Sequence, residues 1–265
     1  MGRVAGLRLP SVLQRLELEL FVRAAGVDLN EVTQPLSAFA SLQEFFTRPL
    51  PSGARPIDPA LDAFVSPCDG FWGEAGAIEH GRLCQVKGRT YSVASLLGSA
   101  ERAAVFEGGA FATLYLAPHN YHRLHTPCAL RIDAAEYIAG TLWPVNRAGL
   151  EGVENLFASN ERIAAYASVD GYGPGARICM VAVGAVMVGK VRLVFDDLTT
   201  NIGGADSAPR LRTYEPGVDF DKGIEWGRFE FGSTVVLLAS PGAVDLEPGA
   251  PGSSVRLGER IGRLR

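Results

Sequence analysis

Short apolar runs separated by glycine, aspartate and proline constrain the fold of this chain most strongly. They include "GAFATLYLAP" (109–118), "ARICMVAVGAVMVGKVRLVF" (176–195) and "STVVLLAS" (233–240). Runs of this length at close intervals are typical of strands in a sandwich or barrel. The 31 glycines fit the many tight turns that such a fold needs. We therefore expect a predominantly antiparallel β domain, sandwich-like or barrel-like, over residues 51–265.

The first fifty residues have a different pattern, which predicts helices. Ser11 with Gln14 resembles a capping box. Apolar residues then recur at helical spacing in two stripes, Leu13, Leu16 and Leu20, followed by Phe39, Leu42, Phe45 and Phe46. A proline- and glycine-rich connector, 49–60, follows them. Together with the β region this predicts an α+β fold with N-terminal helices over 1–50.

Either stripe can pack onto the main domain or contact a membrane surface. Glu17 and Glu19 weaken attraction to anionic lipid, so the residues alone favour packing. No run of 18 apolar residues is present, and no transmembrane helix is expected. The N-terminus also lacks the apolar core of a signal peptide.

Charge and cysteine content exclude several classes of function. The chain has 29 acidic and 25 basic residues, and this balance gives no argument for nucleic acid binding. The four cysteines are scattered without a CxxC pair, which argues against a cysteine zinc site or a disulfide framework. "GAVMVGK" (184–190) matches part of a phosphate-binding loop, but Val191 replaces the required hydroxyl residue. A strand of small residues is the expected structure there.

Three of the four histidines lie in "LAPHNYHRLHTP" (116–127), which invites acid–base chemistry. A helical turn would place His122 and His125 on one face, whereas an extended chain would place them on opposite faces. One alternative is a metal-dependent hydrolase that uses His119, His122, His125 and Asp69. The histidine spacing is awkward for it, because the third ring would lie about 120° around a helix from the first. A non-catalytic β binding module is the second alternative.

Asp69 and Ser233 complete a set that could activate a hydroxyl. Asp69 lies in the turn-forming "SPCDG" (66–70) and could orient an imidazole. Ser233 lacks the GxSxG elbow of a hydrolase nucleophile, and strand alternation places it on a buried face. Its nearest carbonyl belongs to Gly232, where the missing Cβ permits a strained backbone. The residues therefore favour self-cleavage at Gly232–Ser233 over hydrolysis of an outside ester.

Several stretches in the same order resemble the phosphatidylserine decarboxylase family. They are "FFTRPLPSGARPID" (45–58), "SPCDG" (66–70), "APHNYHRLHTP" (117–127), "LFASNER" (156–162), "VGAVMVGKV" (183–191), "KGIEWGRFEFGSTVVLL" (222–238) and "VRLGERIG" (255–262). The order of "YHRLH" and "GST" is highly specific. The resemblance covers residue 40 onward and is weakest before that point.

The resemblance implies a proenzyme that makes its own pyruvoyl cofactor, with no metal. Asp69 and His125 would activate Ser233, whose hydroxyl attacks the Gly232 carbonyl and converts the amide into an ester. Elimination and hydrolysis would then leave a β chain of residues 1–232 and an α chain of 33 residues that begins with the pyruvoyl group. That group supplies an electron sink, and His122 would protonate the carbon that loses carbon dioxide.

The implied reaction converts phosphatidylserine into phosphatidylethanolamine. A lipid substrate is reached at a bilayer, so the resemblance implies a peripheral enzyme on the cytoplasmic face of the cell membrane. It also reverses the preference for the two N-terminal stripes, and we expect residues 11–26 and 37–47 to face the membrane. A homodimer of the cleaved α/β unit is implied as well, and no nucleic acid partner.

Overall fold

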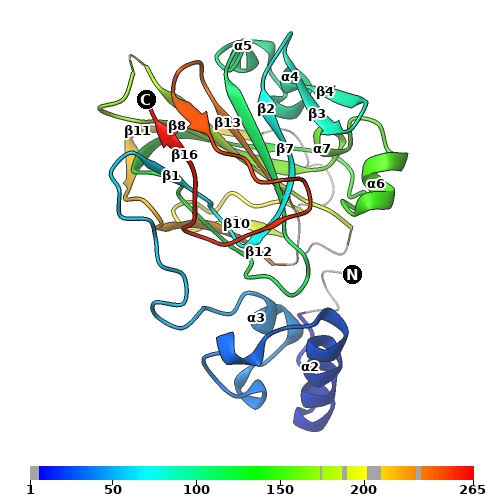
Figure 1. Ribbon diagram of the computed structural model, residues 1–265. Helices are drawn as coiled ribbons and strands as arrows, with labels where there is room; N and C mark the ends of the chain where they lie inside the picture. The colour runs from blue at the N-terminus through cyan, green and yellow to red at the C-terminus, as the bar shows by residue number, and fades with distance from the viewer. Residues whose placement is uncertain (1–5, 174, 187–189, 202–209, 231–233) are drawn as a thin grey trace.

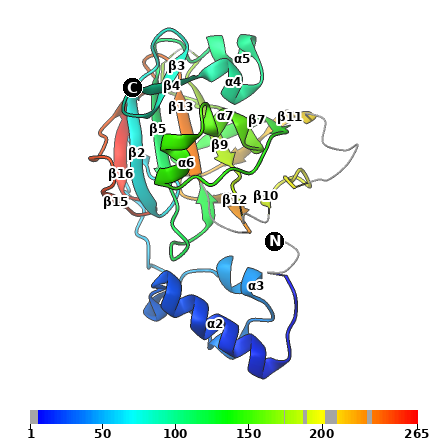
Figure 2. The ribbon, with the colours of Figure 1, turned by 90° about the vertical axis from the view of Figure 1, so that its right-hand side faces the viewer.

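The computed structural model describes residues 6–173, 175–186, 190–201, 210–230 and 234–265. A group of N-terminal helices lies beside a larger body of strands in both views (Figures 1 and 2). The expected class, predominantly antiparallel β with N-terminal helices, is confirmed, because every ladder between the described strands is antiparallel.

The N-terminal helices are α2 (Ser11–Ala25), η1 (Leu29–Glu31), η2 (Leu36–Ala38) and α3 (Leu42–Phe46). They share a small apolar core, which includes Leu18, Val22 and Phe45. The predicted capping box is wrong. Pro10 is the N-cap of α2 and makes no side-chain cap, while the Gln14 side chain accepts the N–H of Leu9. No described helix is long and apolar enough to cross a membrane.

The two apolar stripes behave differently. Leu13, Leu16 and Leu20 on α2 are 52%, 51% and 57% exposed, because the helix buries the face that carries Leu18 and Val22. The second stripe is largely buried: Phe39, Phe45 and Phe46 are at most 3% exposed. The expectation that residues 37–47 face a membrane is therefore wrong for these three rings, which pack inward.

The body is built on an eight-stranded sheet in the order β11-β7-β8-β9-β13-β5-β2-β15. Its strands are β2 (Gly70–Ala77), β5 (Ala110–Tyr115), β7 (Leu130–Ile138), β8 (Arg162–Ser168), β9 (Arg177–Val183), β11 (Arg210–Phe220), β13 (Thr234–Ala239) and β15 (Ser254–Val255). β13 lies between β9 and β5, paired with both, and all six of its residues are buried. A strand covered on both faces explains the continuous apolar run in its sequence.

Smaller sheets pack on this one. β1 (Ala63–Val65), β16 (Arg260–Leu264) and β14 (Val244–Leu246) form one, and β10 (Val191–Leu193), β12 (Glu225–Phe229) and β6 (Arg123–His125) form another. One core includes Phe64, Trp226 and Val236 from three different sheets, as expected for a sandwich-like body. The remaining elements are β3 (Arg82–Val86), β4 (Arg89–Ser92), α4 (Val93–Leu97), α5 (Ala100–Ala104), α6 (Arg147–Gly152) and α7 (Leu156–Ser159).

The strand expected within residues 184–190 is wrong for the part that the structure describes. β9 ends at Val183, and Gly184–Val186 continue as a loop. The Gly184 N–H donates to the Glu161 carbonyl, and the Gly184 carbonyl accepts a hydrogen bond from the Asn160 side-chain amide.

Candidate active site

Main-chain hydrogen bonds bring the 66–70 segment and the 222–238 segment together on either side of β6. The His125 N–H donates to the Pro67 carbonyl at 2.8 Å, and Val65 donates to Pro127 at 2.8 Å. On its other side β6 pairs with β12, where Glu225 lies opposite His125. The 66–70 turn and β12 therefore flank the histidine segment.

His122 is a fully buried imidazole with one nitrogen fixed. Its Nδ1 lies 2.8 Å from the Asn120 carbonyl, which only accepts, so Nδ1 carries the proton. The Phe46 ring lies over it at a centroid distance of 3.9 Å. Burial lowers the pKa of His122 to about 3. The neutral ring has a basic Nε2, and this atom has no hydrogen-bond partner within the described residues.

His125 uses both of its ring nitrogens. Nδ1 lies 2.9 Å from the Gly223 carbonyl, and Nε2 lies 3.1 Å from the Tyr121 hydroxyl. Burial lowers the pKa of this ring as well. The segment is extended, so His122 and His125 have different surroundings, as alternation along a strand requires. Among the described residues, no three His, Cys, Asp or Glu side chains are grouped to hold a metal ion.

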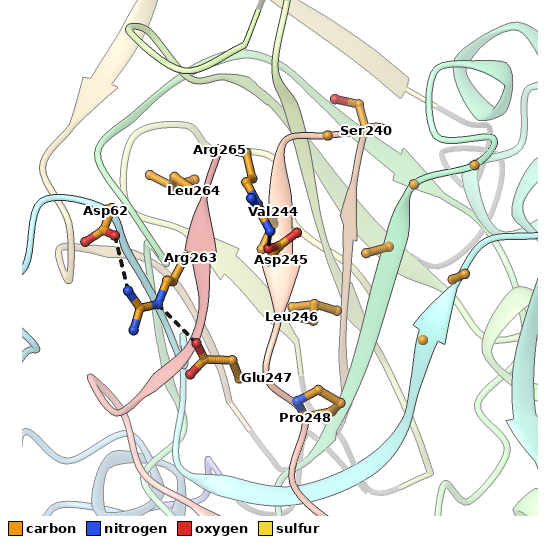
Figure 3. Close-up of a pocket in the computed structure, with 16 residues that line it drawn as sticks. Asp62, Ser240, Val244, Asp245, Leu246, Glu247, Pro248, Arg263, Leu264 and Arg265 are labelled. Carbon is orange, nitrogen blue, oxygen red and sulfur yellow. Dashed lines mark hydrogen bonds and ion pairs between the residues drawn. The ribbon is translucent and has the colours of Figure 1, made fainter.

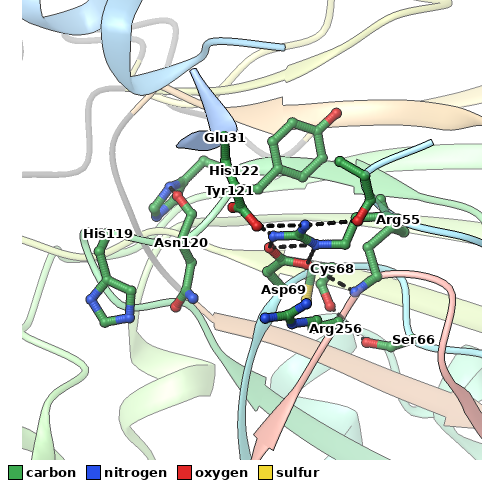
Figure 4. Close-up of polar contacts among 12 residues, drawn as sticks. Glu31, Arg55, Ser66, Cys68, Asp69, His119, Asn120, Tyr121, His122 and Arg256 are labelled. Atoms are coloured by element: carbon green, nitrogen blue, oxygen red, sulfur yellow. Dashed lines mark hydrogen bonds and ion pairs between the residues drawn. The ribbon is translucent and has the colours of Figure 1, made fainter. Parts of the chain in front are cut away.

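Asp69 is buried and held by Arg55. The Arg55 guanidinium donates to both carboxylate oxygens at 2.6–3.1 Å, and the Leu257 N–H donates to Oδ1 at 2.9 Å. The far edge of the same guanidinium binds Glu31 of η1 (Figure 4). The expected pairing of Asp69 with His125 is not made between these two described side chains, because Arg55 occupies the carboxylate and Gly223 takes the Nδ1 proton.

The expected cleavage site, Gly232–Ser233, lies outside the described residues. The chain on either side of it is well anchored. Phe229 donates its N–H to the His122 carbonyl at 2.9 Å, and Glu230 donates to Lys190 at 2.7 Å. Beyond the gap, Thr234 pairs with Tyr115 of β5 and with Val183 of β9. The His122 backbone is therefore tied to the chain just before Ser233.

An apolar pocket of about 200 Å³ adjoins the start of β13. Tyr115, the partner of Thr234, lines it together with Phe21 and Phe46 of the N-terminal helices, Leu116, Pro118, Pro144, Val145, Asn146, Ala185 and Val186. A larger cleft of about 880 Å³ lies elsewhere, beside β14 and β16 (Figure 3). There Arg263 pairs with Asp62 and Glu247, so the lining charges satisfy one another.

Sequence reasoning missed four residues that hold the site: Arg55, Glu31, Tyr121 and Gly223. Arg55 lies in the proline-rich connector, whose composition indicated only a linker. Gly223 acts through its carbonyl, which no side-chain pattern can reveal. Arg55, Tyr121 and Gly223 all lie in stretches that resemble the family, and Tyr121 also lies between the histidines of "HNYHRLH".

Comparisons with known proteins identify the family. The phosphatidylserine decarboxylase family model matches residues 42–263. A phosphatidylserine decarboxylase proenzyme from Anaeromyxobacter sp. (strain K) is 43% identical over 265 residues, covering 99% of this chain and 92% of the relative. Proenzymes of the same name from Myxococcus xanthus and Brevibacillus brevis are 36% and 38% identical, covering 99% and 98% of this chain and 91% and 92% of their own lengths. The chain belongs to the phosphatidylserine decarboxylase family.

Proposed function

We propose that this protein decarboxylates phosphatidylserine to phosphatidylethanolamine after cleaving itself between Gly232 and Ser233. The observation that carries the proposal is the match over 99% of the chain to relatives named phosphatidylserine decarboxylase proenzymes. A proenzyme must be processed, and "FGST" is the segment where the chain's own chemistry favours cleavage. The comparisons give no support to a metal-dependent hydrolase or to a non-catalytic binding module.

The surroundings of β13 fit a pyruvoyl group formed from Ser233. Thr234 Oγ1 and His122 Nε2 are buried polar atoms without a hydrogen-bond partner in the described part of the chain. Such atoms are costly to bury unless another group supplies the bond, and a polar group joined to Thr234 would supply it. When present, a pyruvoyl group supplies the electron sink for the pair of electrons that carbon dioxide leaves behind.

The two histidines suit two different tasks. His122 is neutral at physiological pH, so its Nε2 can accept a proton and return it to the substrate carbon after carbon dioxide leaves. The Phe46 ring helps to exclude water from it. His125 also has a single basic nitrogen and would serve as the base for self-cleavage, with Asp69 as a fixed negative charge close by.

The N-terminal region, 1–50, would bring the catalytic domain, 51–265, to the lipid. The exposed leucine stripe of α2 suits burial among acyl chains, and Phe21 of the same helix lines the apolar pocket next to β13. We therefore propose peripheral binding through α2. The family resemblance also supports a place on the cytoplasmic face and a dimer of the cleaved α/β unit.

A denaturing gel with intact-mass analysis tests the cleavage. We expect a fragment that ends at Gly232 and a 33-residue fragment with a blocked N-terminus, together with release of carbon dioxide from phosphatidylserine in detergent micelles. Ser233→Ala should stay a single chain without activity. His122→Asn should still cleave but lose turnover. An active wild-type preparation that remains full length would overturn the proposal.

A further inference from the structure

The β body carries an exposed tryptophan on the loop between β7 and α6. Trp143 is 48% exposed, and Val186, on the loop that follows β9, is also 48% exposed. The two loops are neighbours, because the Val186 N–H donates to the Trp143 carbonyl at 3.3 Å. Residues 143–146 and 184–186 together form an apolar rim, the 143/186 rim. Exposed apolar residues that gather in this way are typical of an interaction surface.

The fold holds the main chain of Trp143 in place. The fully buried Asn160 side chain accepts the Trp143 N–H at 2.8 Å and donates to the Trp143 carbonyl at 2.9 Å. The same amide donates to the Gly184 carbonyl at 2.8 Å, so one buried side chain fixes both loops of the rim. Trp143 is thus kept in an exposed position, where the exposed part of its indole is removed from water only by a partner.

The 143/186 rim shares a pocket with the N-terminal helices. The apolar pocket of about 200 Å³ is lined by Phe21 of α2 and by Pro144 and Val186 of the rim, among others. Phe21 follows Leu20, the last residue of the exposed leucine stripe of α2. The leucine stripe and the rim are therefore two exposed apolar surfaces that adjoin one pocket.

We propose that the 143/186 rim is a second membrane-contacting surface, and that Trp143 anchors the β body in a phospholipid bilayer. The inference rests on the proposed function, in which the substrate is a lipid, and extends membrane contact from α2 to the β body. A bilayer suits this residue because tryptophan combines an apolar ring with a polar N–H and is enriched where acyl chains meet headgroups. A second contact also fixes how the β body lies on the bilayer, which one helix alone leaves open.

The tryptophans of this chain provide a direct test. The chain has three, and Trp72 and Trp226 are buried, so a lipid-dependent change in emission reports on Trp143. Vesicles of equal parts phosphatidylcholine and phosphatidylglycerol offer an anionic bilayer without the proposed substrate. On these vesicles we expect the emission of the full-length protein to shift to shorter wavelengths and to be quenched by bromine atoms on the acyl chains. Trp143→Phe should lose both changes.

Three results of this experiment would overturn the proposal. The first is wild-type protein that sediments with the vesicles but shows neither the shift nor the quenching. The second is a Trp143→Phe variant that keeps both changes, because a buried tryptophan would then be their source. The third is wild-type protein that does not sediment with the vesicles at all.

The contribution of Trp143 to binding is measured by vesicle sedimentation of Trp143→Glu. We expect binding at least about tenfold weaker than that of wild type, because a charge replaces an apolar ring that the bilayer would bury. The matched control is Val105→Glu, at a 45% exposed valine that ends α5. This helix lies far from α2 in both views (Figures 1 and 2), and the variant should bind like wild type. Equal binding by wild type and Trp143→Glu, or equal weakening in both variants, would contradict the anchor.

A second copy of this chain is the competing occupant of the rim. Sedimentation velocity without lipid tests it: a smaller species for Trp143→Glu than for wild type would assign the rim to a dimer and overturn the membrane proposal. We expect the same species for both proteins.

Fragment analysis and carbon dioxide release in micelles test the proposed function separately. If wild-type protein cleaves and decarboxylates while Trp143 does not respond to the bilayer, the inference fails and the function stands. If Trp143 responds but wild-type protein never cleaves, the function fails and the membrane surface stands.

Discussion

His122 and His125 lie three residues apart, and their rings have different surroundings because the chain between them is extended. Each ring has its Nδ1 proton fixed by a backbone carbonyl, from Asn120 or from Gly223. They differ at Nε2. In His125 this atom lies 3.1 Å from the Tyr121 hydroxyl, whereas in His122 it has no hydrogen-bond partner among the described residues. The sequence identified both residues but left open a helical turn or a strand. The extended conformation is fixed by main-chain hydrogen bonds to residues far along the chain, and the spacing of the histidines gives no information about those bonds.

The buried neutral state of His122 predicts a loss of stability in acid. Above pH 6.5 neither the folded nor the unfolded state carries this proton. Between pH 6.5 and about 3 only the unfolded state binds it, so the free energy of unfolding falls as the pH falls. At pH 5 the contribution of this residue is about 2 kcal/mol. Urea unfolding of single-chain Ser233→Ala at pH 7 and pH 5 measures it.

His122→Asn in the same background is the control, because its amide can still donate to the Asn120 carbonyl but does not titrate in this range. This variant should lose about 2 kcal/mol less between the two pH values than the parent does. An identical loss in both proteins would show that the pKa of His122 is the same in the folded and unfolded states, which would contradict its burial as a neutral ring.

Arg55 is the counter-ion of both Asp69 and Glu31. Its side chain is 7% exposed and that of Asp69 is 5% exposed, so Arg55→Leu leaves a carboxylate buried without its counter-ion. We expect a loss of about 3–5 kcal/mol in the free energy of unfolding, measured by urea titration of Ser233→Ala protein. Arg131→Leu removes the exposed pair with Asp219 and should cost at most about 1 kcal/mol. Similar losses for both would contradict the buried role of Arg55.

At the scale of elements, helical spacing predicts a helix but does not say which face is covered. The leucines of α2 and the phenylalanines around α3 have similar periodicity, yet only the phenylalanines are buried. The difference depends on what folds against each face. Phe45 lies in the apolar core of the N-terminal helices, and Phe46 contacts both Phe21 of α2 and His122. A single sequence carries no information about that packing.

The exposed stripe of α2 leads to a prediction about membrane binding. Leu13→Glu and Leu16→Glu should each weaken binding to phosphatidylserine vesicles by at least about tenfold, because each replaces an apolar side chain that the bilayer would bury. Leu61→Glu, at an 89% exposed leucine just before β1, is the control and should bind like wild type. Activity on detergent-dispersed substrate should be unchanged in all three. Sedimentation with vesicles measures the binding, and an unaffected Leu13→Glu would exclude this face.

On the scale of the whole molecule, the sequence predicts the class of fold but not its topology. Apolar runs broken by turns indicate antiparallel strands, and the structure confirms them. The order of the strands depends on pairings between distant segments, such as β5 with β13. The site depends on the same long-range pairings, because Asp69, His125 and Leu257 meet only once β1, β6 and β16 are in place. Motif order could identify these segments, but their contacts come from the assembled sheets.

Cleavage at Gly232–Ser233 should therefore leave the two fragments firmly associated. The last 33 residues supply β13, which pairs along its full length with β9 and β5, and also β14, β15 and β16. All four cysteines lie before Gly232, so no disulfide can join the fragments and the association is non-covalent. The buried apolar strand at the centre of the sheet provides the stability. Gel filtration of cleaved protein in reducing buffer should recover both fragments in one peak, and urea should release the small one only as the sheet unfolds. Loss of the small fragment under native conditions would contradict this association.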